Sequence, residues 1–164
     1  LLIVPQLLKA GFIFGGSGGH GVLIVNDEKK GQWSQPAFYS IGSVSFGLQI
    51  GGEAAEVIMM LRTQKAVDKM LTTSAKLGAD TSIAAGPVGA GVKSNVVADV
   101  LSFSRSEGAF AGLSLDGSVA STREEWNAAY YCKPASPVDI LVTHSVSNPG
   151  SAELRKTVTN AVGK

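Results

Sequence analysis

The stretch Gly15–Gly21 reads GGSGGHG and decides how the first part of the chain folds. From Gly16 onward it satisfies the spacing G-x-G-x-x-G, which in dinucleotide-binding proteins wraps the backbone around a pyrophosphate. Such a loop binds phosphate because it leads into the N-terminus of a helix, where free N–H groups face the ligand. Here the stretch leads into Val22–Val25, a short β-branched run that predicts a strand. The sequence therefore disfavours a nucleotide site.

The residues on either side indicate what these glycines do. Ala10–Phe14, before the stretch, is also strand-like, and Gln35–Gly42 contains no acidic residue at the distance where a ribose hydroxyl would need one. We interpret the glycines as a bulge or hairpin connection between two strands, which needs positive φ and close backbone packing. Anion binding by their free N–H groups is the alternative.

The composition is that of a globular domain with little net charge. The chain has 164 residues, 45% of them hydrophobic, and its 20 glycines are a high share for that length. Fourteen Lys and Arg oppose 13 Asp and Glu, a net charge of +1, so nothing predicts nucleic acid as a partner. No apolar run approaches the roughly 20 residues of a transmembrane helix. One cysteine, Cys132, and two histidines form no metal-ligand pattern, so we expect no metal and no cofactor.

The order of apolar runs, glycines and capping residues predicts the fold class. Strand-like runs interrupted by glycines indicate a strongly curved sheet. Helices are expected at Thr63–Leu71 with Thr63 as its cap, at Ser121–Tyr131 behind a capping box, and at Ser151–Val162, with a short helix or strand beginning at Ser136. We predict an α+β fold with a curved, largely antiparallel, glycine-rich sheet or small barrel packed with a few helices. Residues 1–164 then form a single domain, to which the helix at about 150–162 could be an appendage.

The residues that could carry catalysis are few. His144 with Asp139 and a serine could be drawn as a hydrolytic triad, but so could such a set in most chains of this length. Glu124 and Glu125 are adjacent on a predicted helix and point in different directions, which suits first-turn charges better than a catalytic pair. Gly15–Gly19 has the letters G-x-S-x-G, but it leads into a strand and not into the helix that a nucleophile elbow requires. We therefore predict a non-enzymatic protein, with a hydrolase built on His144 as a minor alternative.

Binding to a membrane surface needs only exposed aromatic side chains beside a few basic ones. Basic and aromatic residues lie close together in two parts of the sequence, and a hairpin could bring them to one edge. The predicted lipid-binding residues are Lys9, Phe12, Phe14, Lys29, Lys30 and Trp33. The alternative is that the lysines are merely solvated at a hairpin tip and the aromatic rings belong to the core.

Six motifs stand in order between about Leu1 and Pro137. They are GGSGGHGV at Gly15–Val22, WSQPAFY at Trp33–Tyr39, SFGLQIGGE at Ser45–Glu53, AGPVG at Ala85–Gly89, SFSRSEGAFAGLSLDG at Ser102–Gly117 and NAAYY at Asn127–Tyr131. Together they resemble the SYLF domain, also called the Ysc84 or actin-binding-domain family. Six ordered motifs make this resemblance far more specific than any single glycine motif.

The resemblance implies a lipid-binding module. Eukaryotic members bind phosphoinositides and, in fungi, actin, beside SH3 or FYVE domains, whereas bacterial members are typically single-domain secreted proteins or lipoproteins. Because this chain has no appended module, we expect a bacterial envelope protein of the periplasm or outer membrane that binds membrane phospholipids, and we do not expect actin as a partner.

Two further expectations accompany the resemblance. The basic amphipathic segment credited with lipid binding in eukaryotic relatives would lie before Leu1, so no lipid-binding residue is carried over from it. The alternative function is a structural or host-interaction protein with incidental lipid affinity, which would use exposed loops such as Asn26–Gly31 as its contact surface.

Overall fold

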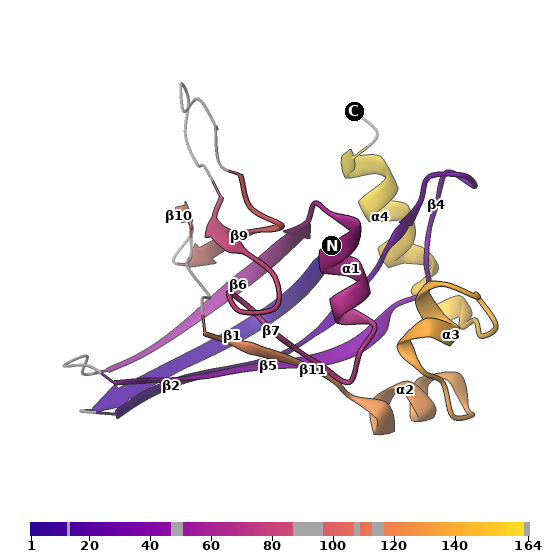
Figure 1. Ribbon diagram of the computed structural model, residues 1–164. Coiled ribbons are helices and arrows are strands. Elements are labelled where there is room, and N and C mark those ends of the chain that lie inside the picture. Colours follow the sequence, from indigo (N-terminus) through magenta and orange to yellow (C-terminus); the bar gives the residue numbers. More distant parts are fainter. Residues whose placement is uncertain (13, 47–50, 87–96, 107–108, 113–116, 163–164) are drawn as a thin grey trace.

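The computed structural model describes residues 1–12, 14–46, 51–86, 97–106, 109–112 and 117–162 (Figure 1). Its strands are β1 (Leu2–Phe12), β2 (Phe14–Leu23), β3 (Asn26–Asp27), β4 (Gln32–Trp33), β5 (Ala37–Phe46), β6 (Gly51–Leu61), β7 (Ser74–Lys76), β8 (Ile83–Ala85), β9 (Val100–Ser106), β10 (Ala109–Gly112) and β11 (Val119–Thr122). Its helices are α1 (Gln64–Met70), α2 (Glu124–Tyr131), α3 (Pro137–Leu141) and α4 (Ala152–Val162), with a 3₁₀ turn, η1, at Pro149–Ser151.

The long strands form one curved sheet. In the described residues its order is β10-β9-β6-β1-β2-β5-β11-β7 with antiparallel neighbours, and β8 joins β9 in parallel. The short strands β3 and β4 form a separate hairpin. Figure 1 shows the helices gathered toward one end of the sheet, near β4. This architecture confirms the predicted α+β class. No helix in the described ranges is long and apolar enough to cross a membrane.

The glycine-rich stretch lies inside β2 and does not connect two strands, which corrects the sequence-based interpretation. Its residues pair with β1 on one side and with β5 on the other. Residue 13, between β1 and β2, lies outside the described residues. The described glycines with positive φ are Gly31, Gly78 and Gly117, and none of them belongs to this stretch. The stretch is therefore extended backbone, and its lack of side chains serves packing.

The neighbouring strand explains why glycine is needed there. Between Ile3 and Gln6 the register shifts, because β1 contains one residue more than β2 at that place. A Cβ atom on Gly21 would lie 2.3 Å from the carbonyl oxygen of Ile3, and one on Gly19 would lie 2.6 Å from that of Gln6. Real Cβ atoms essentially never come closer than 3.0 Å. The predicted close backbone packing is confirmed, and the bulge itself lies in β1.

One face of the sheet packs against α1 and α3. Buried residues alternate with exposed ones along β6, where Ala55, Val57 and Met59 face the core. Tyr39 of β5 is 1% exposed, and its hydroxyl donates a hydrogen bond to the carbonyl oxygen of Met70 in α1. Burial raises the pKa of Tyr39 to about 12. The helices are thus fixed to the sheet by apolar packing and by a buried polar contact.

Two helix starts test the predicted caps. Thr63 caps α1 as predicted, because its hydroxyl accepts a hydrogen bond from the Ala66 N–H at 3.2 Å. The capping box predicted at the start of α2 is wrong. Ser121 and Thr122 belong to β11, and the N-cap residue Arg123 makes no capping bond with its side chain. Pairing with β5 and β7 engages the backbone of β11 and leaves these residues extended.

The C-terminal helix is confirmed as α4, at Ala152–Val162. It follows η1, where the side chain of Asn148 accepts a hydrogen bond from the Gly150 N–H at 2.8 Å. Val158 is its buried residue, so one side of the helix contacts the rest of the molecule.

Candidate functional site

The β3–β4 hairpin presents two of the predicted lysines at its tip. Asp27 ends β3, and its Oδ1 accepts hydrogen bonds from the backbone N–H groups of Lys29 at 3.0 Å and Lys30 at 3.3 Å. The Gly31 N–H donates to the carbonyl oxygen of Asp27 at 2.8 Å, and Gly31 has a φ of +62°, a region that favours glycine. Asp27 and Gly31 thereby fix the turn, and the side chains of Lys29 and Lys30 are exposed.

The base of the hairpin is anchored by a buried serine. Ser34 is 3% exposed, its hydroxyl accepts a hydrogen bond from the Val25 N–H at 2.9 Å, and it donates to the carbonyl oxygen of Gln35 at 3.0 Å. The Ser34 N–H donates to the carbonyl oxygen of Val25 at 2.8 Å. These bonds hold the two arms of the hairpin in one orientation.

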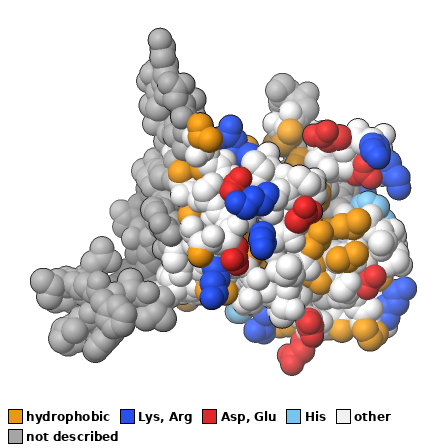
Figure 2. All heavy atoms as spheres, viewed as in Figure 1, with side chains coloured by type: hydrophobic (Ala, Val, Ile, Leu, Met, Phe, Trp, Pro, Cys, Tyr) orange, Lys and Arg blue, Asp and Glu red, His pale blue; other side chains and the backbone are white. Residues whose placement is uncertain are grey.

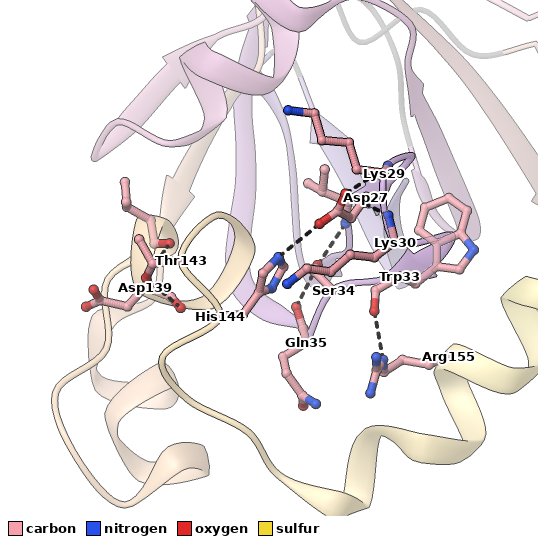
Figure 3. A network of polar contacts seen from close by, with 12 residues as sticks. Asp27, Lys29, Lys30, Trp33, Ser34, Gln35, Asp139, Thr143, His144 and Arg155 are labelled. Carbon is pink, nitrogen blue, oxygen red and sulfur yellow. Dashed lines mark hydrogen bonds and ion pairs between the residues drawn. The ribbon is translucent and has the colours of Figure 1, made fainter.

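The C-terminal segment is bonded to the hairpin (Figure 3). Gln35 Oε1 accepts hydrogen bonds from the Asn148 N–H at 3.2 Å and from the Ser151 hydroxyl at 2.7 Å. Arg155 of α4 donates its Nε–H to the carbonyl oxygen of Trp33 at 2.9 Å. The bonded residues are 113 to 122 positions apart in the sequence. The predicted C-terminal helix is therefore tied to a hairpin from the N-terminal part of the chain.

His144 approaches the same hairpin from the segment after α3. Its φ of +53° is rare for a residue with a side chain. Its Nε2 lies 3.7 Å from Asp27 Oδ2, as Figure 3 shows, and both side chains are less than a third exposed. Oδ1 of Asp27 thus bonds the backbone of the turn, and its Oδ2 faces the imidazole of His144.

Asp139, the acid of the hypothetical triad, serves the start of α3 instead. Its Oδ2 accepts a hydrogen bond from the Ser136 N–H at 3.0 Å, and the Ser136 hydroxyl accepts one from the Asp139 N–H at 3.1 Å. Hydrogen bonds to Ser136 hold the pKa of Asp139 below its usual value. The carboxylate beside His144 is that of Asp27, so the structure pairs the histidine with a residue of the hairpin.

A recess of about 160 Å³ lies between the hairpin and the C-terminal segment. Lys30, Arg155 and His144 all line it, together with Trp33. Because the Asp27 carboxylate is already engaged, the recess offers more hydrogen-bond donors than free acceptors, which suits an anionic group. Within the described part of the chain, no three His, Cys, Asp or Glu side chains gather closely enough to hold a metal ion.

The structure separates the six predicted lipid-binding residues into two groups. Three lie on the hairpin and three at the opposite end of the β1–β2 pair: Lys29, Lys30 and Trp33 in the first group, Lys9, Phe12 and Phe14 in the second. The ten residues of β2 span roughly 30 Å between these ends, at about 3.3 Å per residue. The six residues therefore do not form one edge, and only the hairpin group adjoins the recess. Lipid binding by either group stays a prediction.

Sequence reasoning missed the residues that give the hairpin its surroundings. Asp27, Gln35 and Arg155 were not among the predicted site residues. An Asp followed four positions later by Gly is a turn signature that could have identified Asp27. Nothing local in the sequence marks Gln35 or Arg155, because their partners are more than 100 positions away.

Comparison with known proteins shows what the chain is similar to. Residues 42–161 match the profile of a family described as "Ysc84: Las17-binding protein actin regulator". The chain is 33% identical over 157 residues to SH3 domain-containing YSC84-like protein 1 of Rattus norvegicus. The aligned stretch covers 93% of the chain and 46% of that protein. It is 35% identical over 137 residues to LAS seventeen-binding protein 3 of Saccharomyces cerevisiae, covering 79% of the chain and 30% of that protein. No solved structure gives a significant match.

These matches correct one expectation and confirm another. The chain spans less than half the length of these relatives. The family is described as an actin regulator, which contradicts the expectation that actin is not a partner. The relatives named above are eukaryotic, so an origin in the bacterial envelope stays a prediction. The resemblance drawn from the six motifs is confirmed, and the chain belongs to the Ysc84 family.

Proposed function

We propose that this domain is a non-catalytic binding module that acts in actin regulation, and that the β3–β4 hairpin with its recess contacts an acidic surface of the partner. The observation that carries the proposal is the placement of Lys29 and Lys30 on an exposed tip that Asp27 and Gly31 hold in one conformation. A fixed tip loses little conformational freedom on binding, so more of its interaction energy contributes to affinity.

The charges around the tip favour an acidic partner. Asp27 faces its own turn and His144, and Glu28 is the exposed acidic residue of the turn. The positive charges nearby outnumber that of Glu28: they belong to Lys29, Lys30 and, in the recess, Arg155. A local excess of positive charge steers an acidic partner toward this end of the molecule and sets its orientation there.

Actin is the first candidate partner, because the family that the chain matches is described as an actin regulator. The test is co-sedimentation of the 1–164 chain with actin filaments. The double variant Lys29→Glu, Lys30→Glu should bind about tenfold more weakly or worse, as expected when two charge contacts become repulsive. The control is Lys69→Glu, Lys76→Glu, which reverses two exposed lysines on α1 and β7.

The outcomes separate three cases. Loss of binding in the hairpin variant alone supports the proposed contact. Equal loss in both variants means that filament binding follows overall charge, which argues against the hairpin. Failure of the unaltered chain to co-sediment removes direct filament binding from the proposal.

An anionic phospholipid surface is the second candidate. The observation that favours it is Trp33, a partly exposed ring beside Lys29 and Lys30, since tryptophan next to basic residues is typical of contact with a bilayer interface. Flotation with phosphatidylserine vesicles should be salt-sensitive and should be lost in the hairpin variant, while phosphatidylcholine vesicles should not bind. Flotation that is equal for both vesicle types would exclude an electrostatic contact.

A further inference from the structure

The outer face of the sheet, opposite the face that packs against α1 and α3, carries an unbroken row of apolar side chains. In an antiparallel sheet, directly paired residues point to the same face. The register pairs Phe38 with Val22, Val22 with Ile3, Ile3 with Ile58 and Ile58 with Phe103. We call these five residues the outer strip. It crosses five neighbouring strands of the sheet, in the order β5, β2, β1, β6 and β9.

The outer strip departs from the usual pattern of an antiparallel sheet, in which the uncovered face is polar. Ile58 is 44% exposed, and Met60, two residues along β6, is 43% exposed. Trp126 of α2 is 38% exposed and lies against Phe38, with 6.1 Å between the ring centroids. Trp126 therefore extends the apolar surface beyond β5. Figure 2, viewed from the same side as Figure 1, shows that exposed hydrophobic side chains lie among charged ones on that face of the molecule. A continuous apolar surface of the kind that the outer strip forms marks an interaction site.

The row next to the outer strip is polar. Glu56 pairs with Arg105 between β6 and β9, and Gln6 pairs with His20 between β1 and β2. Gln6 and His20 are both exposed. An apolar strip beside a polar row has the arrangement of the dry centre and wet rim of a protein interface.

Charges of opposite sign lie near the two ends of the outer strip. Arg123 lies over the ring of Trp126, with its Cζ 4.7 Å from the ring centroid, and makes no ion pair among the described residues. Near the other end, the side chain of Glu56 is 64% exposed, and its Oε2 is 4.0 Å from Arg105 Nη1. This distance is long for an ion pair, so Glu56 retains room for a second cation.

We propose that the outer strip is the surface through which two copies of this domain associate. A two-fold axis makes one patch its own partner, because each contact then occurs twice. An axis along β2, between two facing sheets, brings Trp126 toward Ile58 of the partner subunit and Arg123 toward Glu56 of the partner subunit. Such a symmetric contact brings together the opposite charges that lie near the two ends of the outer strip.

The size of the outer strip fits the centre of such an interface. Its five strands cover four spacings, about 19 Å at 4.8 Å each. Truncation of a few apolar residues at the centre of an interface typically removes most of the affinity. The strip uses no residue of the β3–β4 hairpin, so this inference goes beyond the proposed function. Association would present two hairpin tips on one particle and raise their joint affinity for a repeated partner.

The test is the molar mass of the 1–164 chain, measured by sedimentation equilibrium over a range of concentrations. We expect a monomer–dimer equilibrium. Ile58→Lys should weaken association at least tenfold, because it buries an unpaired charge against the apolar surface of the partner subunit. The matched control is Val142→Lys, which places the same charge on an apolar residue that is 50% exposed at the end of α3. It should leave the dimerisation constant unchanged.

A charge exchange tests the orientation and does not depend on the core of the sheet. Arg123→Glu and Glu56→Arg should each weaken association, and the double variant should restore it, because each charge then meets its opposite across the axis. Circular dichroism of each variant is the control for folding. Lys29→Glu, Lys30→Glu should dimerise normally, so failure of the proposed function would not affect this result.

Three results would overturn the inference. One is a chain that stays monomeric up to millimolar concentration. Another is a dimer that Ile58→Lys leaves intact. The third is a monomer whose binding to vesicles is lost in Ile58→Lys, which would assign the outer strip to lipid and exclude a second copy as its occupant.

Discussion

Gly19 and Gly21 differ from Gly18 and Gly42, although all four lie in the neighbouring central strands β2 and β5. A Cβ atom on Gly19 or Gly21 would meet a backbone carbonyl oxygen at 2.6 or 2.3 Å. A Cβ atom on Gly18 or Gly42 would meet its nearest neighbour at 3.9 or 3.7 Å, an ordinary van der Waals distance. The first pair has no room for a side chain and the second pair does.

The bulge in β1 causes this difference. Side chains alternate between the two faces of a strand, so Gly19 and Gly21 share one face while Gly18 lies on the other. The extra residue of β1 pushes the carbonyl groups of Ile3 and Gln6 toward the first face. A run of glycines in a sequence therefore does not assign the same role to each of them. The neighbouring strand decides which glycines are required.

Gly21→Ala should have the largest effect. The added methyl group meets the Ile3 carbonyl oxygen at 2.3 Å and a methyl group of Val4 at 2.9 Å, and neither the paired backbone nor the buried Val4 can move freely. We expect a loss of about 3 kcal/mol or more in the free energy of unfolding, at the upper end of overpacking. Urea denaturation measures it. A loss under about 1 kcal/mol would mean that the bulge relaxes, and would remove the contrast drawn here.

Gly19→Ala should cost less, about 2 kcal/mol. Its methyl group would meet the Gln6 carbonyl oxygen at 2.6 Å and Val4 Cγ1 at 3.1 Å, and both contacts are longer than those at Gly21. The same denaturation series compares the two variants. If Gly19→Ala proved the more damaging, the Gln6 side of the bulge would be its rigid part, and the order of distances would not predict the order of energies.

The strands, the helices and the fold class could be predicted because they depend on local patterns. The apolar run Val57–Leu61 and the cap at Thr63 are visible in the sequence, and in the structure they form the end of β6 and the start of α1. The bulge could not be predicted from the glycines, because it belongs to the partner strand. Its one sequence signal is Pro5, which lacks the N–H that a regular ladder requires.

The candidate site could be predicted only in part, for the same reason. The turn residues of Asn26–Gly31 predicted a hairpin, and its lysines are exposed at the tip. The recess depends on Arg155 and His144, which reach the hairpin through contacts across most of the chain. The separation of Lys9 from Lys29 depends on where β1 turns into β2, and the sequence alone placed that turn within the glycines.

Gly31→Ala should have a moderate effect of a different kind. Gly31 has a φ of +62°, and no atom lies within 4 Å of the place that a Cβ would take, so the cost is backbone strain without a clash. We expect a loss of about 1 kcal/mol, the usual penalty of this conformation for a residue with a side chain. Gly31→Asn should recover part of that loss, since asparagine tolerates positive φ. The matched substitution Gly21→Asn should recover nothing, because a clash does not depend on φ.

Gly18→Ala and Gly42→Ala should have the smallest effect, and its sign is favourable. Both residues have ordinary extended backbone and room for a methyl group, and alanine restricts the unfolded chain more than glycine does. We expect each substitution to raise the free energy of unfolding by about 0.5 kcal/mol. The two residues pair directly across β2 and β5, so the double variant tests whether two facing methyl groups add their effects. A loss above about 1 kcal/mol that appears only at concentrations where the chain associates would mean that a second copy covers this part of the face.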